Sequence, residues 1–337
     1  MCVAAKKTWS VMMIRKKMIG CHLVVLVALY AYLGGLAFGQ EYGRLNPQPN
    51  PLVSKEDLLQ VTGDFSGVQL KKDINILWLY GPEDHKPGEH DYIRVKELFL
   101  PMLDSIPRVT VDEAYEFPAK EQFERADLLI QYLHLPNLTD DQFRMYREFV
   151  NRGGGVVSIH ESCIMRPLEQ AEKLADCIGC SWMGNDVSKW SKFGHANPLF
   201  LKTEHPAFRG LPSKILLNDE SYWSLMTRGN VESIAAVAPA SESDLTIFAD
   251  VMNEESIRSH AFWTYRSGRG KVFGTTTGHY TYTFHDPMYR ILLLRGVAWV
   301  LEEDPAPFMP LVFKGITNKN GLVGTTDLMF DYKNRKR

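Results

Sequence analysis

The stretch Gly153-Gly154-Gly155-Val156-Val157-Ser158-Ile159-His160-Glu161-Ser162-Cys163 combines three signals that together indicate the fold. The glycines predict the end of a helix, and the apolar run after them predicts a short strand buried on both faces. Three reactive side chains, His160, Glu161 and Cys163, follow directly. Ligands of open α/β sheets bind just outside the carboxyl ends of the strands. The stretch therefore predicts a functional site at the end of a sheet strand.

The rest of the chain alternates between the patterns of strands and helices. Thr139 and Gln142 form the capping box of a helix, and Asp286-Pro287 is the start signal of another. We expect strands at 74–80, 109–115, 126–132, 156–160, 234–237, 260–265 and 271–276, and helices at 92–104, 139–153, 168–178 and 286–301. This order predicts an α/β fold with a mostly parallel sheet and helices on both sides. An antiparallel hairpin is expected at 267–270, whereas 183–233 lacks periodicity and is expected to cover the carboxyl edge of the sheet with loops.

The N-terminal segment has the features of a secretory signal. Three basic residues precede an apolar run, and Ala37-Phe38-Gly39 provides a cleavage site before Gln40. The alternative is an uncleaved membrane anchor over 18–38. We therefore divide the chain into a signal peptide (1–39), a proline-rich extended leader (40–72), an α/β domain (73–303) and a C-terminal extension (304–337). The protein is then expected to be exported, periplasmic or extracellular, without a stable membrane span after cleavage.

Composition narrows the classes of partner and cofactor. The chain has 337 residues and a formal net charge of −2, with no basic stripe, so a nucleic-acid partner is not expected. After signal removal three cysteines remain, Cys163, Cys177 and Cys180, which is not a disulfide framework. Cys177 and Cys180 could still close a local bridge in an oxidising compartment. A zinc ribbon is excluded because there is no second cysteine pair.

Four groups of chemically active residues follow expected strands. The loop 84–91 carries His85 and His90 between carboxylates and can bind a metal or a polar ligand, although a solvated loop would look the same. The pair His160-Glu161 can supply acid-base chemistry, unless the histidine only satisfies a backbone carbonyl. His279 leaves the last expected strand through a glycine and would lie beside His160 if the two strands are neighbours.

The fourth group is Asp219-Glu220-Ser221-Tyr222-Trp223. Carboxylates next to aromatic rings are common in carbohydrate sites, because sugar C–H faces stack on rings while hydroxyls need acceptors. An ordinary acidic pair on the surface is the alternative. Cys163 remains a possible nucleophile, but the nucleophile-elbow, dinucleotide-binding and Walker A motifs are absent from the sequence.

Taken together, the motifs resemble those of the ThuA-like family, named for trehalose utilisation, within the class I glutamine amidotransferase-like superfamily. The similarity spans about 73–303. It rests on the motifs His85-x-Pro87-Gly88-x-His90-Asp91-Tyr92, 153–160, His205-Pro206-Ala207-Phe208-Arg209-Gly210-Leu211-Pro212, Asp219-Glu220-x-Tyr222, Gly268-x-Gly270-Lys271-Val272-Phe273 with Gly278-His279, and 286–299. The resemblance implies a flavodoxin-like three-layer sandwich and a role in the breakdown of disaccharides or oxidised (3-keto) sugars. His160 stands where amidotransferases have their nucleophilic cysteine, which argues against glutamine hydrolysis.

We therefore expect an exported enzyme that cleaves a carbohydrate as a hydrolase or lyase. His160, His279 and Glu220 are the expected acid-base groups or the ligands of a divalent metal such as zinc, with Glu161 in support. The expected substrate-binding residues are His85, His90, Asp219, Tyr222 and Trp223, the last two as a sugar platform. The alternatives are a non-catalytic carbohydrate-binding protein and a structural protein on the same fold. A small-molecule carbohydrate is the expected partner, and the protein could form a homo-oligomer.

Overall fold

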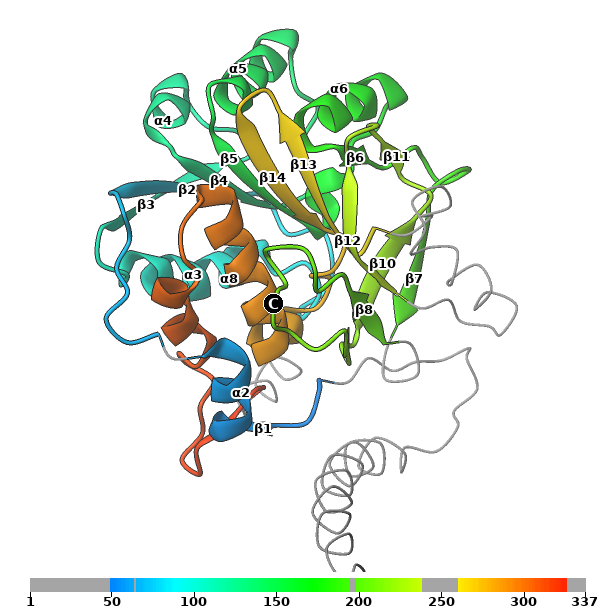
Figure 1. Ribbon diagram of the computed structural model, residues 1–337. Coiled ribbons are helices and arrows are strands. Elements are labelled where there is room, and N and C mark those ends of the chain that lie inside the picture. Colours follow the sequence, from blue (N-terminus) through cyan, green and yellow to red (C-terminus); the bar gives the residue numbers. More distant parts are fainter. Residues whose placement is uncertain (1–48, 64, 194–197, 238–259, 326–337) are drawn as a thin grey trace, which may run out of the picture. The chain divides into compact units, whose positions relative to one another are not determined.

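A nine-stranded sheet forms the centre of the computed structural model, which describes residues 49–63, 65–193, 198–237 and 260–325 (Figure 1). Five parallel strands make one part of it, in the spatial order β3 (Val109–Tyr115), β2 (Ile74–Tyr80), β4 (Leu128–Tyr132), β5 (Gly155–Ile159) and β14 (Gly270–Thr275). Four antiparallel strands continue it: β13 (Phe262–Ser267), β12 (Glu232–Val237), β8 (Leu199–Leu201) and β9 (Lys214–Ile215). The expected hairpin is confirmed, because β13 and β14 pair from Phe262 with Thr275 to Ser267 with Gly270.

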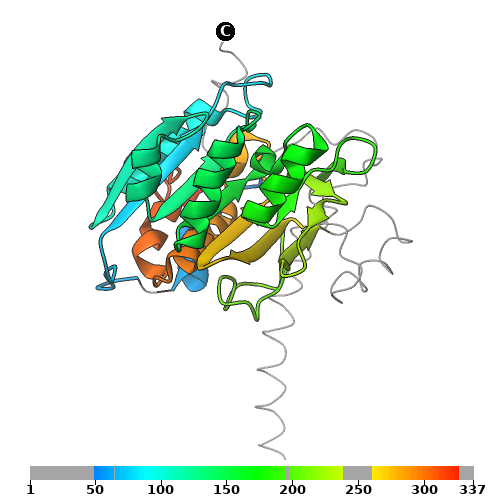
Figure 2. The same cartoon turned by 90° about the horizontal axis from the view of Figure 1, so that it is seen from above.

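Helices cover both faces of this sheet. One face carries α4 (Lys120–Arg125), α5 (Asp140–Asn151) and α6 (Leu168–Ile178); the other carries α3 (Tyr92–Asp104), α8 (Pro287–Leu301) and the short helix η3 (Ala306–Val312). Figures 1 and 2 show the resulting layers from two sides. The three-layer, flavodoxin-like α/β fold expected from the sequence is confirmed.

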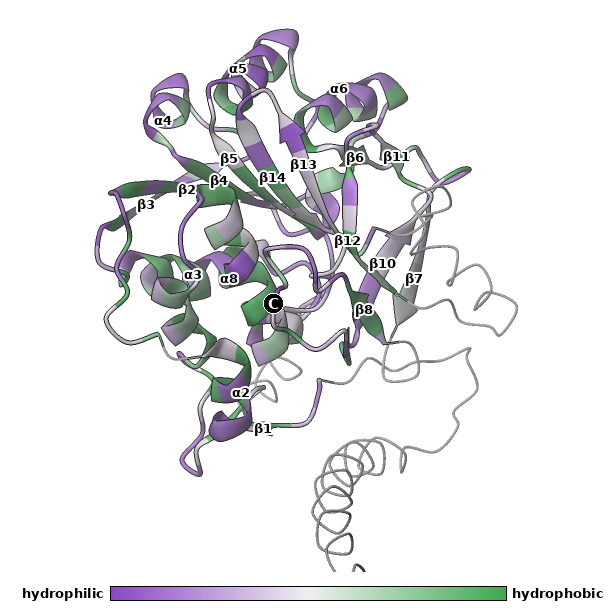
Figure 3. Ribbon diagram, viewed as in Figure 1, coloured by the Kyte–Doolittle hydropathy of each residue, from purple (hydrophilic) through white to green (hydrophobic). Residues whose placement is uncertain are grey.

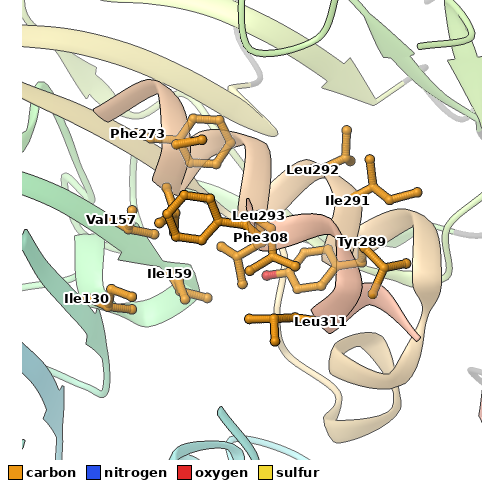
Figure 4. Packing of buried hydrophobic residues seen from close by; sticks show 14 of the residues in the cluster. Ile130, Val157, Ile159, Phe273, Tyr289, Ile291, Leu292, Leu293, Phe308 and Leu311 are labelled. Carbon is orange, nitrogen blue, oxygen red and sulfur yellow. The ribbon is translucent and has the colours of Figure 1, made fainter. Parts of the chain in front are cut away.

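The alternation of side chains along the strands produces two separate apolar cores. On β2, Trp78 packs into the core beneath α3 and α8, whereas Leu77 and Leu79 belong to the core beneath α4, α5 and α6. Figure 4 shows the first core, where strand residues such as Val157 and Phe273 face the α8 side chains. Burial on both faces explains why the inner parallel strands β2, β4 and β5 read as nearly continuous apolar runs. The outer helices, by contrast, carry both hydrophilic and hydrophobic residues (Figure 3).

Local signals in the sequence explain where the helices begin. Thr139 and Gln142 form the expected capping box of α5, and the Asp286 carboxylate accepts the backbone N–H groups of Met288 and Tyr289 at the start of α8. Each cap satisfies donors that have no partner within the helix. These caps fix the helix starts that follow β4 and β14.

The expectation of loops over 183–233 is wrong. In addition to β8, β9 and the start of β12, this stretch contains β7 (Lys189–Phe193), β10 (Asp219–Trp223) and β11 (Met226–Thr227). β7 pairs with β10 as an antiparallel two-stranded ribbon, and β11 pairs with β6 (Cys180–Ser181). The strands of these ribbons are short and of mixed polarity, so they lack the run of apolar residues by which a core strand is recognised in a sequence. This region therefore brings an ordered ribbon, rather than loops, to the neighbourhood of the parallel strands.

The two segments outside the expected domain are also partly structured. The leader was expected to be extended to residue 72, but it contains β1 (Val53–Ser54) and the helix α2 (Lys55–Thr62), capped by the Ser54 side chain. β1 pairs with β15 (Leu322–Val323) of the C-terminal extension. The predicted signal peptide lies outside the described residues. Within the ranges that the structure describes, no helix is both long enough and apolar enough to cross a membrane.

Candidate functional site

Three buried histidines meet at the carboxyl ends of the parallel strands. His160 follows β5 as the first residue of the short helix η1 (His160–Cys163), His279 follows β14, and His90 precedes α3. The His90 Nε2 atom lies 3.0 Å from His160 Nε2 and 2.8 Å from His279 Nδ1, and the latter two atoms are 3.3 Å apart. The expected proximity of His160 and His279 is confirmed, because β5 and β14 are paired neighbours.

The outer nitrogen of each ring faces an acceptor. His160 Nδ1 donates to the Thr276 carbonyl at 2.7 Å, and His90 Nδ1 donates to the Asp84 carboxylate at 2.9 Å. His279 Nε2 faces the Glu89 carboxylate at 3.8 Å. A carbonyl or carboxylate holds the proton of a neutral imidazole on the nitrogen that faces it. The three inner nitrogens of the neutral rings therefore turn their lone pairs toward one another.

Three converging lone pairs can bind one shared cation. Nitrogens bound to one tetrahedral zinc ion at its usual distance are about 3.3 Å apart. The observed separations of 2.8, 3.0 and 3.3 Å are of this size. Outer acceptors that fix the ring orientation are typical of histidines that ligate metals. We call His90, His160 and His279 the trihistidine cluster.

The backbone at the trihistidine cluster adopts unusual conformations. His160 has φ of 54° and His90 has φ of 49°, both in the left-handed region that non-glycine residues seldom occupy. Gly278, with φ of 121°, directs the chain into His279. Strained conformations of this kind cluster at functional sites, where surrounding structure maintains them. Here the left-handed conformations direct the imidazoles of His90 and His160 into the trihistidine cluster.

Comparisons with known proteins identify the family. A family model described as ThuA, trehalose utilisation, matches residues 84–300. The chain belongs to the ThuA family. ThuA-like proteins of solved structure from Parabacteroides merdae and Bacteroides uniformis are 17% and 16% identical, with TM-scores of 0.52 and 0.53. The matches cover 68% and 73% of this chain and 90% and 100% of those chains, and they support the fold. A search of curated proteins gave no match.

In this ThuA-family chain a second group of polar residues surrounds the outer side of His90. The Glu161 carboxylate accepts hydrogen bonds from the Tyr92 hydroxyl and from His134 Nδ1, both at 3.0 Å, and it lies 3.4 Å from His90 Nδ1. His134 was not identified from the sequence. It stands two residues beyond the end of β4, so the rule applied to the other strand ends would have found it.

The ribbon of β7 and β10 supplies Glu220 and Tyr222. The Tyr222 hydroxyl lies 3.0 Å from His160 Nε2, and its ring stacks on that imidazole with centroids 4.9 Å apart. Glu220 Oε2 is 3.8 Å from His279 Nδ1. Of the expected metal set, His160 and His279 lie in the trihistidine cluster, whereas Glu220 lies farther from His279 than His90 does.

Asp219 was expected to bind substrate, but its carboxylate is directed into the protein. It is 1% exposed and accepts the backbone N–H groups of Glu220, Gly278 and His279 and the Thr283 hydroxyl. Thr283 belongs to the short helix η2 (Thr281–His285). Asp219 therefore holds the turn that carries His279, which is a structural role.

The aromatic platform expected from Tyr222 and Trp223 is not formed by these residues. Tyr222 is buried against His160, and Trp223 is half-buried and packs against the apolar core. His85, expected to bind substrate, lies at the partly exposed margin, where its Nδ1 contacts Asp84 at 2.9 Å and its ring lies 3.7 Å from that of His90. The three cysteines of the described chain are buried and free, and burial raises the pKa of Cys163.

The surroundings of the trihistidine cluster favour one positive charge, carried by His90. Burial lowers the pKa of His90, but hydrogen bonds to Asp84 and Glu161 outweigh this effect and raise the pKa to about 9. Burial lowers the pKa of His160, and it lowers that of His279 to about 4. At neutral pH a proton on His90 can therefore bridge the two neutral rings, and a divalent cation would take the place of that proton.

Proposed function

We propose that this ThuA-family protein is a metal-dependent enzyme that cleaves a carbohydrate, with His90, His160 and His279 as the metal ligands. The observation that carries the proposal is the convergence of three imidazole nitrogens within 3.3 Å, each ring oriented by an outer acceptor. Neutral nitrogen ligands suit zinc and other transition metals better than Mg²⁺ or Ca²⁺, and zinc commonly binds three histidines in catalytic sites. Membership of a family described by trehalose utilisation supports the carbohydrate-related role.

Each neighbouring group would have a defined task in this reaction. His90, His160 and His279 would hold a divalent ion, which would polarise an oxygen of the substrate or lower the pKa of bound water. Glu220, 3.8 Å from His279 Nδ1, is placed to accept a proton from the substrate or from water. The Tyr222 hydroxyl, 3.0 Å from His160 Nε2, is placed to donate a hydrogen bond to a developing oxyanion.

The remaining carboxylates orient the cluster rather than react. Asp84 and Glu161 both face His90 Nδ1, at 2.9 and 3.4 Å, and so hold that ring with its Nε2 inward. Loss of such outer partners typically weakens metal binding by about 10–100-fold. Hydrolysis and elimination of a keto-glycoside both need a polarised oxygen and a base, so the proposal covers a hydrolase or a lyase. It does not include glutamine hydrolysis, since His160 replaces the expected nucleophile.

We also propose that the protein is exported through its first 39 residues. The basic start, the apolar run and the small residues before Gln40 support this location. N-terminal sequencing of the secreted or periplasmic fraction tests it, and a mature chain that begins at Gln40 is the expected result.

Elemental analysis combined with turnover of a panel of disaccharides and keto-glycosides tests the proposed enzyme. We expect about one zinc per chain in the wild type and loss of both zinc and turnover in the His90→Ala and His160→Ala variants. His260→Gln is the matched control, because His260 is equally buried but lies outside the cluster. A wild-type protein without stoichiometric metal would refute the metal role. Sugar binding without any turnover would instead indicate a carbohydrate-binding protein.

A further inference from the structure

Trp190 on β7 is the most exposed large apolar side chain of the described residues, at 57%. Single exposed apolar residues are common on protein surfaces, so exposure alone does not indicate a function. The position of Trp190 on the ribbon, however, relates its exposed ring to the trihistidine cluster. Its partner across the strands is Tyr222, and the ribbon pairs over the whole length of β10.

The register places Trp190 on the side of the ribbon that faces the trihistidine cluster. Residues directly opposite each other in an antiparallel pair project to the same face, with Cβ atoms about 5 Å apart. Tyr222 reaches His160 from that face, and Glu220, two residues earlier on the same strand, reaches His279. Trp190 thus belongs to the same row as the two ribbon residues that contact the cluster.

The difference in burial along this row defines an inner and an outer position. Tyr222 is 2% exposed, whereas its neighbour Trp190 remains open to solvent. An indole ring provides a flat apolar surface on which the C–H face of a pyranose can stack, and Glu220 is a nearby acceptor for hydroxyl groups. Tyr222 lies opposite Trp190 across the ribbon and contacts His160 of the trihistidine cluster, so the outer position is one residue removed from the cluster.

We infer that Trp190 is the stacking platform for the outer ring of a disaccharide whose other ring lies at the trihistidine cluster. This inference rests on the proposed function and deepens it by assigning the substrate length. Trp190 replaces Tyr222 and Trp223 as the sugar platform, because those two rings are engaged within the protein. A disaccharide contacts both positions, whereas a monosaccharide at the cluster does not reach Trp190.

Titration calorimetry of the full chain with trehalose and with glucose, combined with zinc analysis, tests the inference. We expect Trp190→Ala to weaken trehalose binding by at least about tenfold and Trp190→Phe to retain it within about threefold. Glucose affinity and zinc content should not change in either variant. Tyr115→Ala is the matched control, because Tyr115 is a 51% exposed aromatic residue on the edge strand β3.

The outcomes separate this inference from the proposed function. Equal trehalose affinity of wild type and Trp190→Ala would overturn the platform and leave the metal site intact. A wild type that binds neither sugar overturns the platform, whereas the proposed function is then decided separately by zinc content and by turnover of the keto-glycoside panel. If His90→Ala loses zinc but still binds trehalose in a way that depends on Trp190, the platform is supported and the metal serves catalysis rather than binding.

Discussion

Replacement of Asp219 by asparagine tests how the turn that carries His279 is held. The Asp219 carboxylate accepts four hydrogen bonds, two at each oxygen, from Glu220, Gly278, His279 and Thr283. An asparagine keeps one oxygen and presents an amide N–H₂ group in place of the other. The Thr283 hydroxyl can reorient and accept a hydrogen bond, but a backbone N–H cannot. At least one buried donor must therefore lose its acceptor.

The expected loss of stability follows from these contacts. A hydrogen bond to a charged group contributes about 1.5–3 kcal/mol, and a buried donor left without a partner costs about 1–3 kcal/mol. We expect Asp219→Asn to lower the free energy of unfolding by about 3 kcal/mol. Urea denaturation at pH 8 is the assay, because burial raises the pKa of Asp219 to about 6 and the carboxylate must be ionised.

Asp286→Asn provides a matched control at a second buried carboxylate. Oδ1 of Asp286 caps α8, and its Oδ2 accepts from the Asn50 side chain at 2.6 Å. Asparagine is as good a helix cap as aspartate, so Asp286→Asn loses only the hydrogen bond from Asn50, whose amide is held in place by Leu216 and Asn218, and a cost of about 1 kcal/mol is expected. If Asp219→Asn costs no more than Asp286→Asn, the assigned role of Asp219 is incorrect.

Three further predictions concern other parts of the molecule. Burial lowers the pKa of His260 to about 4, so the unfolded chain binds the proton more tightly than the folded protein does. Stability is therefore lost as the pH falls from about 6.5 toward 4. In urea titrations at pH 7 and pH 5, His260→Gln should reduce the loss of stability between the two pH values by about 2 kcal/mol. A Cβ at Gly274 would lie 2.1 Å from the Trp263 ring, so Gly274→Ala should cost at least about 1–3 kcal/mol in thermal or chemical unfolding, whereas Gly229→Ala, with no heavy atom within 4 Å, should be neutral. If the cluster binds zinc as proposed, free zinc at a hundredfold excess over its Kd should add about 2.7 kcal/mol to the free energy of unfolding, and a chelator should remove this gain. A chelator effect that persists in His90→Ala would contradict the assignment of His90 as a ligand.

The parallel part of the fold could be predicted because its physical signals are local. β2 and β5 read as continuous apolar runs, since both of their faces are covered, and α5 and α8 begin at capping residues that the sequence shows directly. The approach of His160 and His279 could also be anticipated from strand order. The two histidines come together if β5 and β14 are neighbours in the sheet. The parallel pairing of these strands, which begins with Val156 opposite Val272, makes them neighbours.

The third histidine could not be chosen on the same grounds. His90 and Glu220 are both polar residues of segments that were expected to be loops. Which of them approaches the cluster depends on the left-handed turn at His90 and on the register of a ribbon that the sequence does not reveal. The same ribbon register decides that Trp190, and not Trp223, shares a face with Tyr222. Long-range pairing of short strands is specified by packing rather than by local pattern.

The conformation of His160 links the resemblance to amidotransferases with the proposed metal chemistry. A nucleophile on a sharp turn after a strand is useful because the strained turn presents its side chain at the sheet edge. His160 adopts such a turn, with φ of 54°, and its Nδ1 donates to the Thr276 carbonyl beyond the neighbouring strand. That hydrogen bond orients the ring so that Nε2 points toward His90 and His279. A cysteine at this position has no second polar atom through which the protein could orient it in this way. The same backbone device can therefore present a metal ligand in place of a nucleophile, and retention of φ near 54° in an experimental structure of His160→Ala would show that the surrounding packing, rather than the metal, maintains the turn.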